Sequence, residues 1–264
     1  MSEPRDIGAG LSVAAVIPAL DEARSIAGTL DAVARVRGLC EIIVVDGGSA
    51  DATREIARAH ACGARVTESG RGRGAQMHAG AGVARAQVLW FLHADTRPPA
   101  DGVRAIRDAL ADAGAVGGNF GVAFDGDSRP ARFMTWLYPR LRALGLAYGD
   151  SAFFVRREAY ERAGGFRPFP VFEDLDLVAR LRRHGRFLRA RGRVVTSSRR
   201  FEGRSFLLTF ARWAGLQLLY WLGVHPRALA NFYAPVRAAR TRRRREQPGS
   251  GSQAKASKPL DVRR

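Results

Sequence analysis

Short runs of consecutive apolar residues alternate with longer helical patterns through the first half of the chain. The apolar runs predict strands at 13–17, 41–45, 64–68 and 87–92. The segments between them predict helices at 22–37, 53–61 and 75–84, the first of them capped by Asp21. Because most of these strands are continuous apolar runs rather than alternating ones, both faces of their sheet should be buried. We therefore predict an α/β fold with a mainly parallel sheet and helices on both faces.

The second half of the chain has a less regular pattern. It predicts strands at 116–124 and 152–155 and helices at 131–146 and 173–184. Residues 206–224 are apolar nearly all round, but Arg212 interrupts them, and the stretch after it is too short to cross a membrane. This pattern divides the chain into four parts: a flexible N-terminus (1–11), a folded domain (12–203), an apolar and aromatic helical segment (204–236) and a disordered basic tail (237–264).

Composition and charge narrow the range of functions. With 264 residues, 46% of them hydrophobic and 26% charged, the chain has the composition of a folded globular protein. Its formal net charge of +18 favours an anionic ligand or an anionic membrane face. Part of this charge lies in the tail, which contains ten basic and two acidic residues. The only lysines, Lys255 and Lys258, lie in the tail, which excludes a P-loop. Two cysteines and an N-terminus without a signal-peptide pattern favour the cytoplasm.

Acidic residues follow three of the first four predicted strands. They are Asp21, Asp46 and Asp95, and the carboxyl ends of parallel strands meet at the rim where such sheets bind ligands. Asp46 precedes Gly47-Gly48-Ser49, which would let a ribose or base approach the backbone; a plain turn and helix cap would need the same residues. His93-Ala94-Asp95 suits a divalent cation held together with substrate phosphates, and a capping aspartate is the simpler alternative.

Two further clusters each have two interpretations. Gly70-Arg71-Gly72-Arg73-Gly74 has the glycine density of a phosphate-binding loop but not the G-x-G-x-x-G spacing. Its arginines could contact a diphosphate, or the segment could be an ordinary surface loop. Glu173-Asp174 could supply a general base, or could simply complement the dipole at the start of a helix.

The order of these motifs resembles that of a known enzyme family. The motifs are, in order, residues 17–22, residues 45–51, His93-Ala94-Asp95 and Glu173-Asp174. Motifs in this order resemble those of the family 2 glycosyltransferases. That family has the GT-A fold, whose sheet is Rossmann-like. The spans 71–77, 91–96 and 149–157 resemble more closely a small bacterial subgroup labelled rSAM/selenodomain-associated transferase 2. The resemblance covers roughly residues 12 to 235.

The resemblance implies a transfer of a sugar from a nucleotide-sugar donor that depends on a divalent cation, Mn²⁺ or Mg²⁺. It assigns Asp174 as the catalytic base and Asp95 as the metal ligand, with His93 standing where many members carry Asp. The positions that it assigns to the nucleotide-sugar are Pro18, Ala19, Asp21, Glu22, Asp46 (base or ribose), Arg73, Gln76, His93 and Ala94. The positions that it assigns to the acceptor or the diphosphate are Gly149, Asp150, Glu173, Arg199 and Arg200.

The reaction expected from this resemblance is an in-line displacement with inversion onto a hydroxyl or carboxyl acceptor. The chain lacks the Q-x-x-R-W motif, which argues against a processive synthase. Trp213, Tyr220 and Trp221 suit a membrane interface, so one hypothesis is a lipid-like acceptor at the cytoplasmic face of the inner membrane; the alternatives for this segment are packing against the enzyme or in a homodimer. The rival functions are a sugar-1-phosphate nucleotidyltransferase, whose lysine-bearing signature is missing here, and a nucleic-acid-binding protein, for which no module is visible.

Overall fold

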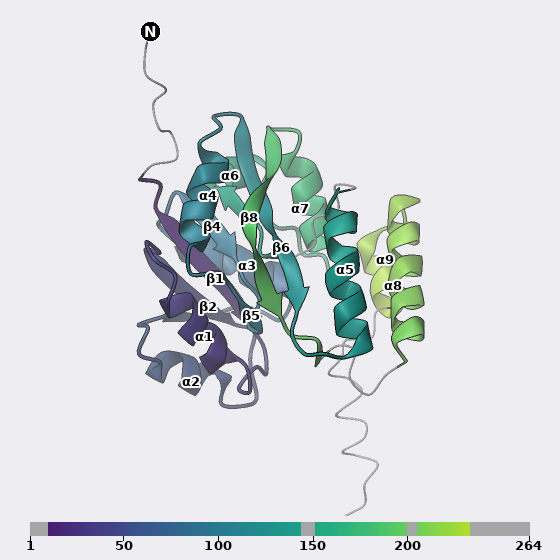
Figure 1. Cartoon of the computed structure of the whole chain (residues 1–264), viewed down its shortest axis with the longest axis horizontal. Helices are drawn as coiled ribbons and strands as arrows, with labels where there is room; N and C mark the ends of the chain where they lie inside the picture. The colour runs from purple at the N-terminus through teal and green to yellow at the C-terminus, as the bar shows by residue number, and fades with distance from the viewer. Residues whose placement is uncertain (1–9, 144–150, 200–204, 233–264) are drawn as a thin grey trace, which may run out of the picture.

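An eight-stranded sheet forms the centre of the molecule (Figure 1). The computed structural model describes residues 10–143, 151–199 and 205–232. The strands are β1 Val13–Ala19, β2 Glu41–Asp46, β3 Arg65–Glu68, β4 Val88–Phe91, β5 Thr96–Arg97, β6 Ala115–Phe124, β7 Phe154–Arg156 and β8 Arg186–Thr196, in the spatial order β3-β2-β1-β4-β7-β6-β8-β5. The strands β1 to β4 pair in parallel, as do β6 and β8, whereas β7 and β5 are antiparallel to their neighbours. The predicted α/β class with a mainly parallel sheet is confirmed.

Helices cover both faces of this sheet. They are α1 Ile26–Ala34, α2 Thr53–Ala59, α3 Arg73–Val83, α4 Gly102–Leu110, α5 Arg129–Ala143, α6 Arg157–Arg162, α7 Glu173–Leu181, α8 Phe206–Trp221 and α9 Pro226–Leu229, followed by the 3₁₀ turn η3 Ala230–Phe232. Alternate residues of β1 point to opposite faces, and all of them are buried. One face packs on α1, α4 and α5, and the other packs on α3, α6 and α7.

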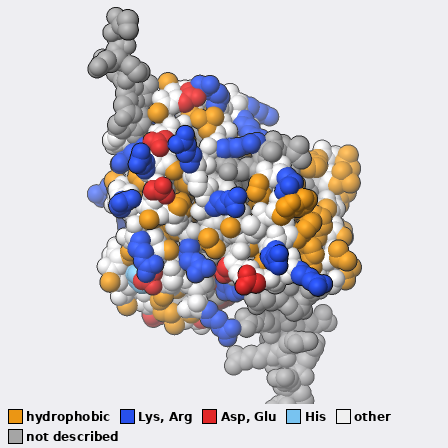
Figure 2. All heavy atoms as spheres, in the orientation of Figure 1, with side chains coloured by type: hydrophobic (Ala, Val, Ile, Leu, Met, Phe, Trp, Pro, Cys, Tyr) orange, Lys and Arg blue, Asp and Glu red, His pale blue; other side chains and the backbone are white. Residues whose placement is uncertain are grey.

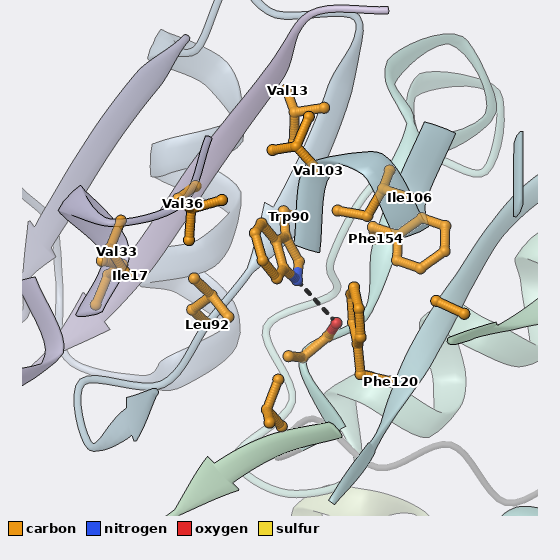
Figure 3. Packing of buried hydrophobic residues seen from close by; sticks show 14 of the residues in the cluster. Val13, Ile17, Val33, Val36, Trp90, Leu92, Val103, Ile106, Phe120 and Phe154 are labelled. Atoms are coloured by element: carbon orange, nitrogen blue, oxygen red, sulfur yellow. Dashed lines mark hydrogen bonds between the residues drawn. The ribbon is translucent and has the colours of Figure 1, made fainter. Parts of the chain in front are cut away.

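Trp90 of β4 lies at the centre of the first of these two cores. Its side chain is fully buried and packs against Phe120 of β6, with ring centroids 5.3 Å apart (Figure 3). Its indole N–H donates a 3.1 Å hydrogen bond to the carbonyl of Ala152. An indole can be buried at little cost only when its N–H has such a partner. The core therefore also fixes the backbone that leads into β7.

Several predicted boundaries were wrong. The first helix begins at Ile26 rather than Glu22, and Asp21 does not cap it, because the Asp21 backbone is left-handed (φ 52°) and its carboxylate accepts a hydrogen bond from Ala50 instead. The helix that begins at Glu173 ends at Leu181 rather than at His184. The pattern also gave no expectation for α4, α6 or β8.

The helix α8 packs beside α5 at one end of the sheet (Figure 1). Phe206 and Phe210 of α8 contact Phe133 of α5, with centroids 5.7 and 6.3 Å apart. Farther along α8, Tyr220 stacks on Phe172, the residue before α7, with centroids 4.9 Å apart. One side of the apolar segment therefore packs against the protein. In the part of the chain that the structure describes, no helix is both long and apolar enough to cross a membrane.

Candidate active site

The carboxyl ends of β1, β2 and β4 meet at one edge of the sheet, as predicted from their parallel pairing. The register places Ala19 beside Asp46. Gln76 of α3 holds these two strand ends together, since its buried side-chain amide donates to the carbonyls of Ala19 at 2.7 Å and Val45 at 2.9 Å. Its amide hydrogens are thus used on the backbone. Gln76 therefore joins the two strand ends, and its predicted role at the nucleotide-sugar stays a prediction.

Asp46 organises the turn that follows β2. Its carboxylate is fully buried and accepts hydrogen bonds from the amides of Gly48 and Ser49, each at 3.0 Å, and from the Ser49 hydroxyl. The Arg54 guanidinium lies 3.7 Å from the same carboxylate. This arrangement is the turn that the simpler interpretation of the motif described. Asp46 therefore acts in this structure as the group that shapes the loop.

The loop after β1 is tied to the loop after β2. The Asp21 amide donates to the Ser49 hydroxyl at 2.9 Å, and the Ala50 amide donates to the Asp21 carboxylate at 2.8 Å. The Glu22 amide donates to the Thr53 hydroxyl at 2.7 Å. These three bonds join the two predicted nucleotide motifs into one surface. Pro18 and Ala19 are buried within β1, so they contribute backbone to that surface.

Arg199 bridges two carboxylates that lie far apart in the sequence. One of its guanidinium nitrogens, Nη2, lies 3.0 Å from Glu22 Oε2 and 3.1 Å from Asp95 Oδ2. The pairing of β5 with β8 sets this geometry, because Thr96 lies opposite Thr196 and their hydroxyls are 3.1 Å apart. Burial lowers the pKa of the Arg199 guanidinium, but the bonds and charges of Glu22 and Asp95 outweigh that effect and raise it.

The neighbours of Asp95 are held by α1. The carbonyl of Ala94 accepts a 2.8 Å hydrogen bond from the Thr29 hydroxyl, and both residues are buried. His93 is half-buried at the end of β4, and the Asp95 side chain is about one quarter exposed at 25%. The His93-Ala94-Asp95 motif therefore leaves the Asp95 carboxylate partly exposed, while the bond from Thr29 to Ala94 anchors the loop.

A second charge cluster lies where α3 meets α7. Arg73, the first residue of α3, forms an ion pair with Glu173, and its Nη2 lies 3.7 Å from Asp174 Oδ2. Gly74 allows this approach, since a Cβ there would come within 3.1 Å of the Glu173 side chain. Glu173 is 2% exposed and Asp174 is 4% exposed. Burial raises the pKa of the Glu173 carboxyl, and the Arg73 charge opposes that rise.

Three residues other than glycine adopt the left-handed backbone conformation, and each adjoins a site motif. They are Asp21 (φ 52°), Ala152 (φ 48°) and Phe172 (φ 59°) among the described residues. Such a conformation costs on the order of 1–3 kcal/mol and persists only where the surroundings impose it. Trp90 fixes the Ala152 carbonyl, and Tyr220 stacks on Phe172 (Figure 3 shows the first of these contacts). Phe172 directly precedes Glu173, so its turn sets the direction in which α7 begins.

The family comparison identifies the enzyme class. The model described as "Glycosyl transferase family 2" matches residues 14–164, more than half of the chain. The chain belongs to this family. It is a glycosyltransferase, and the expectation drawn from the motif order is confirmed at that level. No curated protein matches the chain at a significant level.

Solved structures similar to this glycosyltransferase share its GT-A fold. Glucosyl-3-phosphoglycerate synthase from Mycobacterium tuberculosis, crystallised with Mn²⁺, UDP and its product, is 23% identical with a TM-score of 0.52, over 74% of this chain and 73% of that chain. The same synthase with Mg²⁺ and UDP is 24% identical with a TM-score of 0.52, over 74% and 73%. A mannosyltransferase from Pyrobaculum calidifontis, crystallised with GDP-Man and Mn²⁺, is 21% identical with a TM-score of 0.54, over 70% and 56%.

Most of the predicted site residues of the glycosyltransferase lie in these two charge clusters and the joined loops. Gly149, Asp150 and Arg200 lie outside the described residues. Sequence reasoning missed the hydroxyl groups that connect the loops, chiefly Ser49 and Thr53. It also missed the buried pair formed by Asn119 and Ser151, whose side chains are 3.1 Å apart. A polar residue in an otherwise apolar predicted strand was the available signal for Asn119.

Proposed function

We propose that this glycosyltransferase moves a sugar from a nucleotide-sugar donor to a hydroxyl or carboxyl acceptor, with inversion and without processive synthesis. One observation carries the proposal: two charge clusters at the same sheet edge offer separate groups for the donor and for the acceptor. Arg199, Glu22 and Asp95 form the first, and Arg73 with Glu173-Asp174 forms the second. Gln76 ties the helix that begins at Arg73 to the ends of β1 and β2, and Glu22 lies three residues after the end of β1.

A divalent cation fits the first cluster. Glu22 and Asp95 supply hard carboxylate oxygens, and a positive guanidinium is already held between them at 3.0 and 3.1 Å. The described residues contain no group of three His, Cys, Asp or Glu side chains that could enclose a metal alone. Mg²⁺ and Mn²⁺ sites of this class commonly use one or two carboxylates together with substrate phosphates. When bound, the cation would neutralise charge that develops on the leaving nucleoside diphosphate.

The protein's own residues account for the rest of donor recognition. The joined loops 20–22 and 46–53 form a surface beside the first cluster, where the nucleoside would lie. Arg199 can turn from the carboxylates to the diphosphate, where its charge would stabilise the leaving group. The bound UDP and GDP-Man of the neighbours support a nucleotide-sugar donor. The narrower resemblance to the rSAM/selenodomain-associated subgroup stays a prediction.

Asp174 is the group that we assign as the base. An acceptor hydroxyl is a poor nucleophile until a carboxylate takes its proton as the attack proceeds. Arg73 lies 3.7 Å from Asp174, and the Leu175 amide donates to Asp174 at 2.8 Å, so two partners fix the carboxylate. Glu173 is buried and pairs with Arg73, which makes it a positioning residue. A single displacement with one base leads to inversion at the anomeric carbon.

Replacing Asp174 tests this assignment. Asp174→Asn keeps the shape of the side chain but removes its basicity, so we expect turnover to fall about 10²–10⁴-fold while donor binding is unchanged. Donor binding is measured by calorimetry with Mn²⁺, and turnover by release of nucleoside diphosphate with a panel of alcohol and lipid-phosphate acceptors. Asp176→Asn is the matched control, because Asp176 lies in the same helix but pairs with Arg180 at 2.7 Å.

Three outcomes would contradict the proposal. Unchanged turnover in Asp174→Asn would remove Asp174 as the base. Retained anomeric configuration in the product, read by NMR, would remove the single displacement. Loss of the nucleotide-sugar only in the presence of pyrophosphate would indicate a nucleotidyltransferase.

A further inference from the structure

Large apolar side chains are exposed on one side of the molecule. Among the described residues, every large hydrophobic side chain that is exposed belongs to α5, to α8 with its following residue, or to η3. They are Phe133, Trp136, Leu207, Leu208, Leu218, Leu219, Trp221, Leu222 and Phe232. Figure 2 shows hydrophobic side chains gathered on the side where α5 and α8 lie in Figure 1. Soluble monomers rarely expose such a continuous patch without a function. We refer to these nine residues as the apolar face.

The helix α8 has two apolar sides, and only one of them packs on the protein. Phe206 and Phe210 contact α5, and Tyr220 contacts Phe172. The outer side consists of positions spaced three or four residues apart, which share one face of a helix: Leu207, Ala211, Ala214, Leu218 and Trp221, with Leu208, Gly215 and Leu222 beside them, all of them exposed. Leu207, Leu208 and Leu222 are 75%, 73% and 71% exposed.

The charged residues within the helices α5, α8 and α9 are all arginines. Arg212, the one charged residue of α8, donates to the Phe232 carbonyl at 2.6 Å and so is drawn away from the outer side. The helices α5, α8 and α9 contain no Asp or Glu. Exposed arginines stand on the neighbouring helices, among them Arg132 and Arg140, and the Arg140 guanidinium lies 3.7 Å from the Trp136 ring centroid. Aromatic and aliphatic residues with flanking arginines are typical of helices that lie in an anionic membrane interface.

We propose that the apolar face docks on the surface of an anionic bilayer, with α8 lying in the interface. The inference rests on the proposed function, and it specifies the acceptor as a molecule that is presented by the bilayer. With 16 residues, α8 is shorter than the roughly 20 that span a membrane, so it lies on the bilayer rather than crossing it. Residues 237–264 contain ten basic and two acidic residues, a net charge of the sign that anionic headgroups attract.

Docking in this way would place the reaction beside the bilayer. The outer side of α8 faces the membrane, while Tyr220 on its inner side stacks on Phe172. Phe172 directly precedes Glu173-Asp174. The start of α7 therefore lies behind α8 as seen from the bilayer, at least one helix diameter, roughly 10–12 Å, away from it. A lipid-anchored acceptor could reach Asp174 without leaving the membrane.

Charge favours a bilayer over a second copy of the chain. In a two-fold dimer the same patch meets itself, so the arginines of one apolar face would approach those of the other. Like charges brought together oppose association, whereas anionic headgroups attract them. Dimerisation is therefore the alternative outcome of the test.

Vesicle flotation with the full chain tests the proposal. The probes are vesicles of phosphatidylglycerol and phosphatidylcholine in equal parts, and vesicles of phosphatidylcholine alone. We expect the wild-type protein to float with the anionic vesicles and far less with the neutral ones. The double variant Leu218→Glu with Leu222→Glu should weaken that binding at least tenfold. The charge-matched control Ala61→Glu with Ala111→Glu changes exposed residues near α2 and α4, away from the apolar face, and should bind as the wild type does.

The outcomes separate this proposal from the proposed function. A wild-type protein that stays with the soluble fraction in the presence of anionic vesicles overturns the docking proposal, as does equal binding by the Leu218/Leu222 variant. If light scattering shows that the wild type is a dimer and that the Leu218/Leu222 variant alone is a monomer, the apolar face is an interface between copies of the chain. Donor binding by the same samples is measured separately: if it fails while flotation persists, the proposed function fails and the docking surface stands. Leu207→Ser with Leu208→Ser, at the two most exposed positions, gives a second variant that disturbs no core.

Discussion

Replacing Arg199 by Met should have opposite effects on metal binding and on turnover. In the free enzyme Arg199 Nη2 lies 3.0 Å from Glu22 and 3.1 Å from Asp95, so a cation that binds these carboxylates must displace the guanidinium. Removing the guanidinium removes that competition. The same substitution also removes a positive group from the leaving diphosphate. We therefore expect Mn²⁺ alone to bind more tightly and the transfer reaction to become slower.

The structure sets the size of the first effect. A hydrogen bond to a charged group contributes about 1.5–3 kcal/mol when it is buried, and an exposed ion pair contributes about 0–1 kcal/mol. The Arg199 side chain is 42% exposed and that of Asp95 is 25% exposed, which places the interaction near the lower range, at about 1 kcal/mol. Since about 1.4 kcal/mol corresponds to a tenfold change, the Kd for Mn²⁺ should fall roughly fivefold. Turnover should fall about tenfold or more, because the diphosphate loses a charged partner.

Free Mn²⁺ can be measured by EPR during a titration of the enzyme without nucleotide. Arg58→Met is the matched control, since Arg58 pairs with Glu68 on an exposed surface and should leave the Mn²⁺ affinity unchanged. Thermal melting of each variant excludes a folding defect. The reasoning is refuted if Arg199→Met binds Mn²⁺ no more tightly than the wild type, because then either Asp95 does not hold the cation or Arg199 does not compete with it.

Two further substitutions test how the site is held together. Gln76→Leu removes the side-chain donor from two buried strand-end carbonyls, of which Ala19 keeps the Gly47 amide at 2.9 Å, so the free energy of unfolding in urea should fall by roughly 1–3 kcal/mol. The exposed Gln87→Leu should cost far less. Glu173→Gln should alter the pH dependence of stability. Burial raises the pKa of Glu173 above its ordinary value of 4.5, so between 4.5 and the raised pKa the native wild type holds a proton on Glu173 that the unfolded chain has lost. Its stability therefore falls as the pH rises through that interval. The variant has no titratable group at this position, so it should lack this fall in stability even though it also loses the ion pair with Arg73. If urea unfolding shows the same pH dependence for both proteins, the predicted direction of the Glu173 pKa shift is wrong.

Three of the first four strands, β1, β2 and β4, were predictable because each is a nearly continuous apolar run, whereas β3 (Arg65–Glu68) is short and mixed in polarity. A parallel sheet buries both faces, and such runs satisfy that requirement without reference to the rest of the chain. The strand β8 was not predictable in this way, since four of its eleven residues are arginines and several of its positions are exposed. The end of β1 was placed too early, at Ile17, because Pro18 reads as a breaker even though the strand continues through Ala19.

The meeting of the acidic strand ends was predictable, but the contacts between the candidate site residues were not. The strand ends bring the acidic motifs to one edge, which follows from parallel pairing alone. The pair of Arg73 with Glu173 joins residues 100 positions apart, and that of Arg199 with Glu22 joins residues 177 positions apart. No local pattern encodes such distances. The left-handed backbone at Phe172 could not be predicted from the sequence either, because an aromatic residue rarely adopts it. Its stacking on Tyr220, 48 residues later, accounts for the aromatic residue at this position.

The contact of Phe172 with Tyr220 also bears on where the working enzyme ends. The family match ends at residue 164, so Asp174 lies beyond it. The turn at Phe172, just before Asp174, packs against Tyr220 of α8. A protein that ends before residue 205 would keep all eight strands but would lose the Tyr220 side chain that stacks on Phe172. We therefore expect the smallest active fragment to extend through Trp221, so that one helix would both meet the membrane and support the turn before the proposed base.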